Sequence, residues 1–587
     1  MHRRWLVNRT NPEYIKYLSA TASISPVLAQ ILINRGIKTS EEISSFLNPQ
    51  ISQLSDPFDI PGMKIAVERI LSASRKGEKV LVHGDYDVDG LSATAIVLST
   101  LKKIGIDCEY FIPNRMEHGY GFKPSSVKKA KQTGAGLIIT VDCGITAFEA
   151  ADECRKEGID LIITDHHEPL ISEEQKQAKS IDNLRSSDSM LSAHSSLLIP
   201  DAVAVINPKI SGMTSPVSNL SGAGIAFKLV QALSMLHDSR FTIHEFLDLA
   251  ALGTMADVVP LTDENRFIAR EGMRLLGNGT RPGVQALRRV SGIDGKGLRP
   301  GLLLFTIIPR INAAGRISDS NDVIKLLLTA SEDEASALST WLDKLNSDRQ
   351  QIEEKVYQEA LGMLKNKGLT RVIVLAAEEW HGGVIGIVAS RIAAEFYRPT
   401  FIISIEGNLA RGSARSIPSF DIYRALTGCK VFLKGFGGHK QAAGLELDAN
   451  DIPLFEQYIN SIAEEALTEK DFLPSLEIDA YVDLTDISFN LIRELEMLEP
   501  FGFGNPEPLF GSKGLEVLYP KIVKNNHLKM KLRQKSRSID AIGFDMAAFF
   551  DKLEDSTVVD AVFTPSVNEW NGSRNLQLNL RALRPSK

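Results

Sequence analysis

Short apolar runs alternate with amphipathic segments between residues 76 and 265. An apolar run of four or five residues bounded by turn-forming residues is typical of a buried strand, and the segments between the runs have helical spacing. Strands that alternate with helices indicate a parallel sheet with crossover connections. The predicted strands are KVLVHG, CEYFIP, LIITVD, LIITDH and AVAVINP.

The pattern changes along the rest of the chain and predicts four further regions. Residues 1–75 are mostly helical and form an extension, and residues 266–367 form a helical connector that ends in a long, charge-mixed helix. Residues 368–465 again alternate strands with helices. Residues 466–587 hold a Pro/Gly connector and five or six short strands, which favour an OB-type β-barrel over a purely structural β-domain. The predicted fold class is α/β, with two α/β domains joined by a long helix and a C-terminal barrel.

One predicted strand ends in three alternating acids. In HGDYDVDG, His83 precedes Asp85, Asp87 and Asp89, and Gly90 opens a helix. Residues two apart on an extended chain point the same way, and ligands of α/β proteins bind at this edge of the sheet. Carboxylates crowded on one rim raise one another's pKa unless a cation lies between them. Taken alone, the stretch fits a solvated acidic turn equally well.

Two later strands end in the same way and favour a metal site. LIITVDCG ends in Asp142, and LIITDHH ends in Asp165, His166 and His167. Mg²⁺ and Mn²⁺ prefer oxygen ligands, and histidine extends the choice toward Mn²⁺. Asp257 lies in the apolar segment ALGTMADVVPL, where a carboxylate must be paired or bound to metal because burying it alone is costly.

Composition places few further limits on function. The 587 residues exceed what one core can hold. A net charge of −7 argues weakly against a nucleic-acid binder, but net charge is a poor guide to a local groove. The four cysteines lack metal-ligand spacing and indicate no disulfide framework, and no apolar run approaches the roughly 20 residues that span a bilayer. The N-terminus has no apolar signal core, so we expect a cytoplasmic protein without membrane contact.

The motifs DYDVDG, VDCG, TDHH and GTMADVVPL, in this order, resemble the four motifs of the DHH phosphoesterase superfamily. A closer resemblance is to the bacterial single-strand-specific 5′→3′ DNA exonucleases of this superfamily, and it is carried by PNRMEHGYG, PRINAAGR and WHGGVIGIVASR. This resemblance extends from about Trp5 to the C-terminus. The resemblance implies a DHH catalytic domain, a DHHA1 domain that closes over substrate, and metal-dependent hydrolysis of single-stranded DNA to 5′-mononucleotides in DNA repair and recombination.

The mechanistic hypothesis that follows is two-metal hydrolysis with Mn²⁺ or Mg²⁺. Asp142 bridges the ions, and His167 contacts the scissile phosphate or the attacking water. Asp85 does not bind a metal itself but orients a residue that does, and Asp165 fixes its neighbouring histidine. The expected metal ligands are His83, Asp87, Asp89, Asp142, His166 and Asp257.

The resemblance also implies residues that hold the DNA. Arg115 would bind the 5′-phosphate end, although a plain salt bridge explains it equally well. PRINAAGR is predicted as a Gly-punctuated loop, and GGH as a turn whose following helix offers backbone N–H groups to an anion. SGAGIAF, from Ser221, reads as a Gly-rich turn that serves packing. The expected substrate-binding residues are Arg115, His118, Arg310, Asn312, Arg316, Ser413, Arg415, Ser416, Gly437, Gly438 and His439.

Three other interpretations compete with the exonuclease. A DHH–DHHA1 phosphodiesterase acting on cyclic dinucleotides or short oligoribonucleotides would share the metal site but has no use for an OB-like tail. A type II inorganic pyrophosphatase lacks a DHHA1-like segment, and an inactive scaffold would have lost motif residues that are present here. The expected partner is single-stranded DNA, with single-strand-binding protein or a helicase as candidate protein partners. Residues 171–199 are polar and Ser-rich, and we expect an exposed insertion.

Overall fold

The chain folds into two compact units in the computed structural model. The smaller unit holds Lys344–Ile478 with the residues up to Val7, and the larger holds Asn8–Asp343 with Asp479–Lys587. The structure describes residues 3–114, 121–171, 197–210, 212, 216–237, 241–279, 281–553, 557–570 and 572–586.

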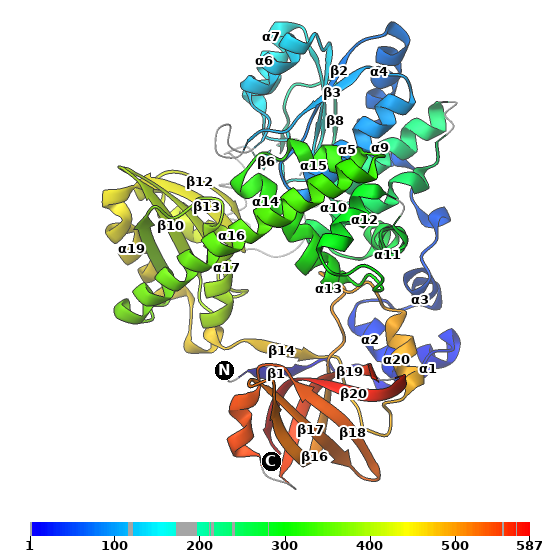
Figure 1. Cartoon of the computed structure of the whole chain (residues 1–587), viewed down its shortest axis with the longest axis vertical. Helices are drawn as coiled ribbons and strands as arrows, with labels where there is room; N and C mark the ends of the chain where they lie inside the picture. The colour runs from blue at the N-terminus through cyan, green and yellow to red at the C-terminus, as the bar shows by residue number, and fades with distance from the viewer. Residues whose placement is uncertain are drawn as a thin grey trace, which may run out of the picture. The chain divides into compact units, whose positions relative to one another are not determined.

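A five-stranded sheet organises the first half of the larger unit (Figure 1). Its strands lie in the order β3-β2-β4-β5-β8 and each neighbouring pair is parallel, which confirms the predicted parallel sheet. Every residue of β2 and β4 is buried, as expected for strands covered on both faces. The bounds are β2 (Val80–His83), β3 (Cys108–Phe111), β4 (Leu137–Val141), β5 (Asp160–Thr164) and β8 (Ala204–Ile206).

Helices cover this sheet and bring further segments to its carboxyl edge. Helix α5 (Val88–Lys103) packs against α9 (Gly222–Leu236) and α10 (Leu247–Ala256). Small side chains of α6 (Pro124–Thr133) and α7 (Phe148–Glu157) share an apolar core with the strands. α4 (Met63–Lys76) packs against β8 and α9.

The helical connector continues from α10 and confirms the predicted long helix. Its helices are α11 (Asp263–Asn278), α12 (Pro282–Val290), α13 (Pro300–Leu302), α14 (Ile308–Ile317), α15 (Asn321–Leu328) and α16 (Glu332–Lys367). α16 has 36 residues, and the boundary between the two units falls within it. None of the described helices combines the length and the apolar character that crossing a membrane requires.

The smaller unit contains a mixed sheet in the order β12-β13-β11-β10-β9. Only β9 and β10 are parallel, and the other neighbours are antiparallel. Strand β1 (Arg4–Val7) pairs with β14 (Ser475–Ile478), a pairing that the helical prediction for residues 1–75 did not include. The other bounds are β9 (Ile373–Glu378), α17 (Ile385–Phe396), β10 (Thr400–Glu406), β11 (Leu409–Arg415), α18 (Ile422–Gly428), β12 (Leu433–His439), β13 (Ala442–Asp448) and α19 (Ile452–Ala466).

The last part of the chain forms the predicted barrel. Strands run in the order β16-β17-β18-β20-β19, and an additional β16–β19 pairing closes the ring of five. The barrel core is continuous with side chains of α1, α2 and α3, so the N-terminal helices pack here. The bounds are α1 (Pro12–Ala22), α2 (Pro26–Asn34), α3 (Ser40–Leu47), β15 (Ala480–Tyr481), α20 (Phe489–Glu496), β16 (Phe510–Val523), β17 (His527–Gln534), β18 (Arg537–Gly543), β19 (Val558–Trp570) and β20 (Ser573–Pro585).

A buried arginine joins distant segments of the larger unit. Arg266 on α11 is only 1% exposed, and its guanidinium lies 3.8 Å from the centre of the Phe46 ring. It donates hydrogen bonds to the backbone carbonyl of Phe46 and to three consecutive carbonyls at residues 497–499. Burial, followed by repulsion from Arg270 and Arg35, lowers the pKa of Arg266 to about 9. This one side chain therefore satisfies carbonyl groups from two segments that flank the barrel.

We expect Arg266→Met to lower the free energy of unfolding by about 3 kcal/mol, because it leaves several buried carbonyls without a donor. Arg274→Met, on the same helix but 58% exposed and paired only with Glu271, should change it by less than about 0.5 kcal/mol. Urea denaturation followed by circular dichroism measures both. Equal effects of the two substitutions would contradict the tie that we assign to Arg266.

Candidate metal centre

The carboxyl ends of three adjacent strands bring the predicted acids and histidines to one edge of the sheet. Asp142 follows β4 directly, and Asp165, His166 and His167 follow β5. Because β4 lies between β2 and β5, Asp142 stands between the Asp-rich loop after β2 and the histidine pair. Asp142 has φ 61°, a left-handed conformation that non-glycine residues rarely adopt outside special sites.

Two helix N-termini hold the alternating acids of the loop after β2. Asp87 is the N-cap of α5, and its side chain accepts hydrogen bonds from the N–H groups of Asp89 and Gly90. Asp89 is 1% exposed and accepts hydrogen bonds from the first N–H groups of α9, at 2.6 Å from Gly222 and 2.9 Å from Ala223. The Gly-rich turn that the sequence assigned to packing therefore also binds a carboxylate.

Glycine is required where the helices approach these acids. A Cβ atom on Gly222 would lie 2.5 Å from Asp142 Oδ1, and one on Gly253 would lie 2.4 Å from Asp89 Oδ1. Both distances are shorter than any non-bonded contact. The two glycines therefore leave room for the carboxylates at the sheet edge.

The converging side chains form three overlapping groups of potential metal ligands. In each group the ligand atoms lie within 4.8 Å of one another, and two of the groups share Asp142. The groups are Asp85, Asp87 and Asp142; Asp89, His166 and Asp257; and Asp142, His166 and His167.

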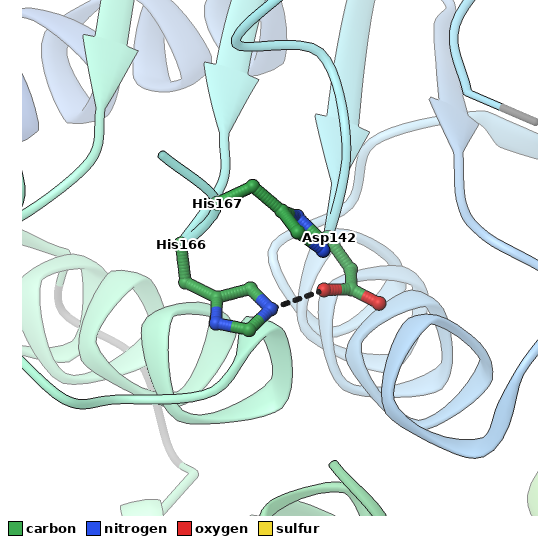
Figure 2. Close-up of side chains that lie close together, drawn as sticks. All are labelled: Asp142, His166 and His167. Carbon is green, nitrogen blue, oxygen red and sulfur yellow. Dashed lines mark ion pairs between the residues drawn. The ribbon is translucent and has the colours of Figure 1, made fainter. Parts of the chain in front are cut away.

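His166 and Asp142 are the central pair. His166 Nε2 lies 3.1 Å from Asp142 Oδ1, 3.6 Å from Asp257 Oδ2 and 4.0 Å from Asp89 Oδ2. Figure 2 shows the His166 ring directed at the Asp142 carboxylate, with His167 beside them. Both atoms are buried, and neither makes a hydrogen bond with any described residue. The lone pair of His166 Nε2 and the oxygen Asp142 Oδ1 are therefore both free to bind one cation that lies between them.

The electrostatics of the cluster also fit a divalent cation. Burial and the neighbouring carboxylates raise the pKa of Asp142 well above its usual range, that of Asp257 to about 8 and that of Asp89 to about 6. Burial lowers the pKa of His166 to about 3, so its ring is neutral and offers a lone pair. Divalent cations stabilise the ionised acids and reverse these shifts.

His83, a predicted ligand, lies outside the three groups, whereas Asp85 lies within one. The His83 ring is fully buried, with its centre 5.8 Å from that of Phe111 and 5.0 Å from that of Phe122. Burial lowers the pKa of His83 to about 3. The geometry thus favours Asp85 over His83 beside Asp87.

Asp165 is placed to orient the histidine pair. It is 1% exposed, and its Oδ1 lies 2.7 Å from Nδ1 of His167 while accepting hydrogen bonds from the N–H groups of His166 and His167. Oδ2 accepts a hydrogen bond from the N–H of Ile145. Burial opposes a charged ring, but the hydrogen bond and charge of Asp165 outweigh it and raise the pKa of His167 to about 9.

The segment after β8 supplies two residues that the sequence analysis did not select. Asn207 is fully buried and donates a hydrogen bond from Nδ2 to the carbonyl of His167, while Oδ1 accepts from the N–H of Lys209. Lys209 Nζ lies 3.1 Å from Glu168, next to the histidine pair. Their only sequence signal was their position at or directly after the end of AVAVINP, a predicted strand of the same sheet.

The predicted loop for PRINAAGR is wrong, because these residues form α14. Arg310 binds Asp343 at 2.8 Å and also donates to the Thr306 carbonyl. Asn312 Oδ1 accepts a hydrogen bond from the N–H of Val88 at 3.2 Å, so it supports the acidic loop from behind. Arg316 lies in the last turn of the helix. The Ala-Ala pair of the motif suits a helix, and Gly315 permits close approach to Tyr86, where a Cβ would lie 2.6 Å from the carbonyl oxygen.

The second set of substrate candidates lies in the smaller unit on adjacent strands. Arg415 of β11 and His439 of β12 are both in register with Ala442 of β13. Ser413 of β11 and Gly437 of β12 are likewise both in register with Gly444 of β13.

These registers place Arg415 and His439 on one face of the sheet, because partners directly across a ladder share a face. Burial and then the charge of Arg415 lower the pKa of His439. Gly386 in the first turn of α17 borders the group, since a Cβ there would lie 3.0 Å from Ser413 Oγ and 3.4 Å from an Arg415 nitrogen. Ser416 follows the strand and donates to the carbonyl of Phe420.

The predicted helix after GGH is wrong. Gly437, Gly438 and His439 are the end of strand β12, residues 440 and 441 form a turn, and the chain returns as β13. A Cβ on Gly438 would lie 2.3 Å from the Ala442 carbonyl oxygen, so glycine serves the tight hairpin and not a helix start. The residues after GGH therefore belong to a strand hairpin and do not form a helix N-terminus that could bind an anion.

Arg115 and His118 lie outside the described residues, as does most of the Ser-rich segment 171–199.

Family models match three parts of the chain. The DHH family N-terminal domain matches residues 79–254, the DHHA1 domain residues 349–465 and the RecJ OB domain residues 478–582. The parallel sheet with its acidic edge and the second α/β domain thus define a DHH phosphoesterase with a DHHA1 domain.

Similarity to individual proteins shows which family within this class the chain belongs to. The single-stranded-DNA-specific exonuclease RecJ of Bacillus subtilis (strain 168) is 37% identical over 98% of this chain and 70% of its own length, and that of Escherichia coli (strain K12) is 32% identical over 95% of both. The crystal structure of RecJ in complex with Mn²⁺ from Thermus thermophilus aligns with a TM-score of 0.82 at 29% identity, covering 100% of this chain and 80% of that one. The chain belongs to the RecJ family.

We expect Asp165→Asn to move the pKa of His167 from about 9 down toward the ordinary value of about 6.5, because the substitution removes the charge that stabilises the imidazolium. The folded-state pKa is raised, so the stability that the pair contributes is complete below about pH 6.5 and is lost as pH rises through about 9. NMR titration of the His167 ring in metal-free protein measures the pKa. An unchanged pKa in the variant would contradict the assignment of Asp165.

Proposed function

We propose that this protein is a metal-dependent exonuclease that hydrolyses single-stranded DNA to 5′-mononucleotides in the 5′→3′ direction, as part of DNA repair and recombination. The observation that carries the proposal is the convergence of overlapping ligand groups on Asp142 at the sheet edge. The names of the relatives support the substrate, and the Mn²⁺-bound and Mg²⁺-bound structures of the Thermus thermophilus protein support the metals.

The residues of the three groups would hold two Mn²⁺ or Mg²⁺ ions. Asp85, Asp87 and Asp142 suit one position, while Asp89, His166 and Asp257 suit the other. Asp142 Oδ1 lies 3.1 Å from His166 Nε2, so Asp142 would also contribute to the second position. Bound ions supply Lewis-acid stabilisation of phosphate charge and lower the pKa of a water molecule.

The chain's own residues complete the chemistry. His167 is held by Asp165, which raises its pKa, and it can donate a hydrogen bond from Nε2 to a phosphate oxygen. Asn207 fixes the backbone of the same loop.

Substrate binding is assigned to both units. Ser413, Arg415, Ser416, Gly437, Gly438 and His439 would bind a DNA phosphate, with Arg115 and His118 as further contacts in the larger unit. A contact to the terminal 5′-phosphate makes cleavage start from an end. A role in substrate binding is less direct for Arg310, Asn312 and Arg316. Arg310 already binds Asp343, and Asn312 already binds the acidic loop.

The alternative substrates are cyclic dinucleotides or short oligoribonucleotides, which a DHH–DHHA1 phosphodiesterase would hydrolyse with the same metal site. The closed barrel and its match to the RecJ OB domain favour long single strands, because OB barrels bind extended single-stranded nucleic acid. We assign the protein to the cytoplasm, where single-strand-binding protein or a helicase would supply its substrate.

Asp142→Ala should abolish Mn²⁺-dependent release of mononucleotides from 5′-labelled single strands, because it removes the ligand common to both ion positions. The same variant should lose the rise in melting temperature that Mn²⁺ gives the wild-type protein. Asp152→Ala is the matched control and should keep both properties, because Asp152 is an exposed acid of α7 that pairs with Arg155.

Duplex DNA and cyclic dinucleotides belong in the same assay. Release of nucleotides from single strands alone supports the proposal. Equal hydrolysis of cyclic dinucleotides, or activity that survives Asp142→Ala, would exclude it.

Arg415→Ala should weaken binding of 5′-phosphorylated strands about tenfold or more while 5′-hydroxyl strands change little, because a charge-assisted contact to the terminal phosphate is lost. Arg411→Ala is the control, since it lies on the same strand but pairs with Glu446. Fluorescence anisotropy with the two oligonucleotides measures the difference. Equal losses on both strands would remove Arg415 from terminal-phosphate recognition.

A further inference from the structure

An exposed aromatic side chain stands in the helical run that supports the acidic loop. Phe305 is 83% exposed, a value that only Val431 equals among the large apolar side chains of the described residues. Leu303 and Ile307, two residues before and after it, are 0% and 1% exposed, and Leu304 and Thr306 are half-buried. Folding therefore buries the surrounding residues wholly or in part and leaves the phenyl ring in water.

The sequence explains why the helix widens at Phe305. Residues 303–307 form a π-helical turn between α13 and α14, in which the N–H of Ile308 bonds to the carbonyl of Leu303 (Figure 1 labels both helices). In an α-helix the N–H of residue 309 would bond to the carbonyl of Phe305, but residue 309 is proline, which has no N–H and whose ring clashes with that carbonyl. The wider turn relieves the clash and inserts one extra residue, and such π-bulges occur often at functional sites.

The segment that follows Phe305 is fixed to the acidic loop of the candidate metal centre. Asn312 binds the N–H of Val88, Gly315 lies against the Tyr86 carbonyl, and Ser320 donates to that carbonyl at 3.2 Å. Phe305 precedes Asn312 by seven residues, which is about 10 Å along a helix axis.

We propose that Phe305 is a stacking platform for a nucleobase of the single strand, close to the cleaved phosphate; this inference rests on the proposed function. An exposed aromatic ring on a rigid helix offers a flat surface on which a base can stack, and such rings bind single strands without reading their sequence. The ring would hold the strand in position while the metal centre acts on the backbone.

The test compares Phe305→Ala and Phe305→Trp with the equally exposed control Val431→Ala, all in the full chain. The Asp142→Ala background prevents hydrolysis during binding measurements. The probes are an oligo-dT strand and a series of the same strand with one abasic site moved along it. Each abasic strand keeps its phosphates and loses one base, so the series separates stacking from charge.

Phe305→Ala should weaken binding of oligo-dT by about 5- to 150-fold with an unchanged salt dependence, because no phosphate contact is lost. The background protein should bind less tightly at one abasic position, and Phe305→Ala should remove that dependence. Phe305→Trp should retain it, and Val431→Ala should leave both strands unaffected.

The proposal fails if Phe305→Ala binds every strand like the background protein, or if it keeps the same abasic dependence. A lower melting temperature in Phe305→Ala that the tryptophan variant does not restore would also overturn it, by making Phe305 a packing residue. If the unsubstituted chain fails to cleave single strands, the proposed function itself fails, which the cleavage assay reports separately.

Discussion

The architecture depends on holding several carboxylates at one buried edge of a parallel sheet. Desolvation and mutual repulsion oppose this arrangement, as the raised pKa values of Asp142 and Asp257 indicate. The chain offsets part of the cost with backbone donors: the first N–H groups of α9 bind Asp89, and the N-terminus of α5 is capped by Asp87. Divalent cations would offset the remainder. The glycines that line the site follow from the same constraint, because any side chain there would displace a carboxylate.

Support for the acidic loop comes from distant parts of the larger unit. α14 meets it through Asn312, and α9 meets it through Gly222. On the other side of the cluster, Asn207 ties the segment after β8 to the histidine pair. Each of these contacts uses a short side chain or the backbone, which leaves little conformational freedom at the site. Such rigidity suits hydrolysis that relies on positioned charges, because preorganised groups need not reorganise when the reaction occurs.

The smaller unit presents a different kind of surface. Arg415, Ser413 and His439 stand on neighbouring strands, so their spacing is set by the ladder and not by a flexible loop. Two exposed features elsewhere, the closed barrel and the ring of Phe305, are typical of proteins that bind extended single strands. The candidate metal ligands, the proposed phosphate contacts and the proposed stacking ring therefore lie on separate structural elements.

The sequence by itself determined the parallel sheet, the long helix, the barrel and the family, because strand ends that repeat Asp and His are local patterns with a fixed direction. It also identified Asp142, His166 and Asp257, although their roles as ligands remain a prediction. It did not determine what α14 and the GGH segment do: PRINAAGR forms a helix and GGH ends a strand, since packing against Tyr86 and pairing with β13 decide these segments. Only the tertiary structure placed Asp85 beside Asp87 and Asp142 while burying His83 among phenylalanines, and only it showed that Gly222, Asn207 and Phe305 stand where chemistry or binding can use them. The reason is that exposure and distance between segments far apart in the chain are properties of packing, which periodicity does not encode.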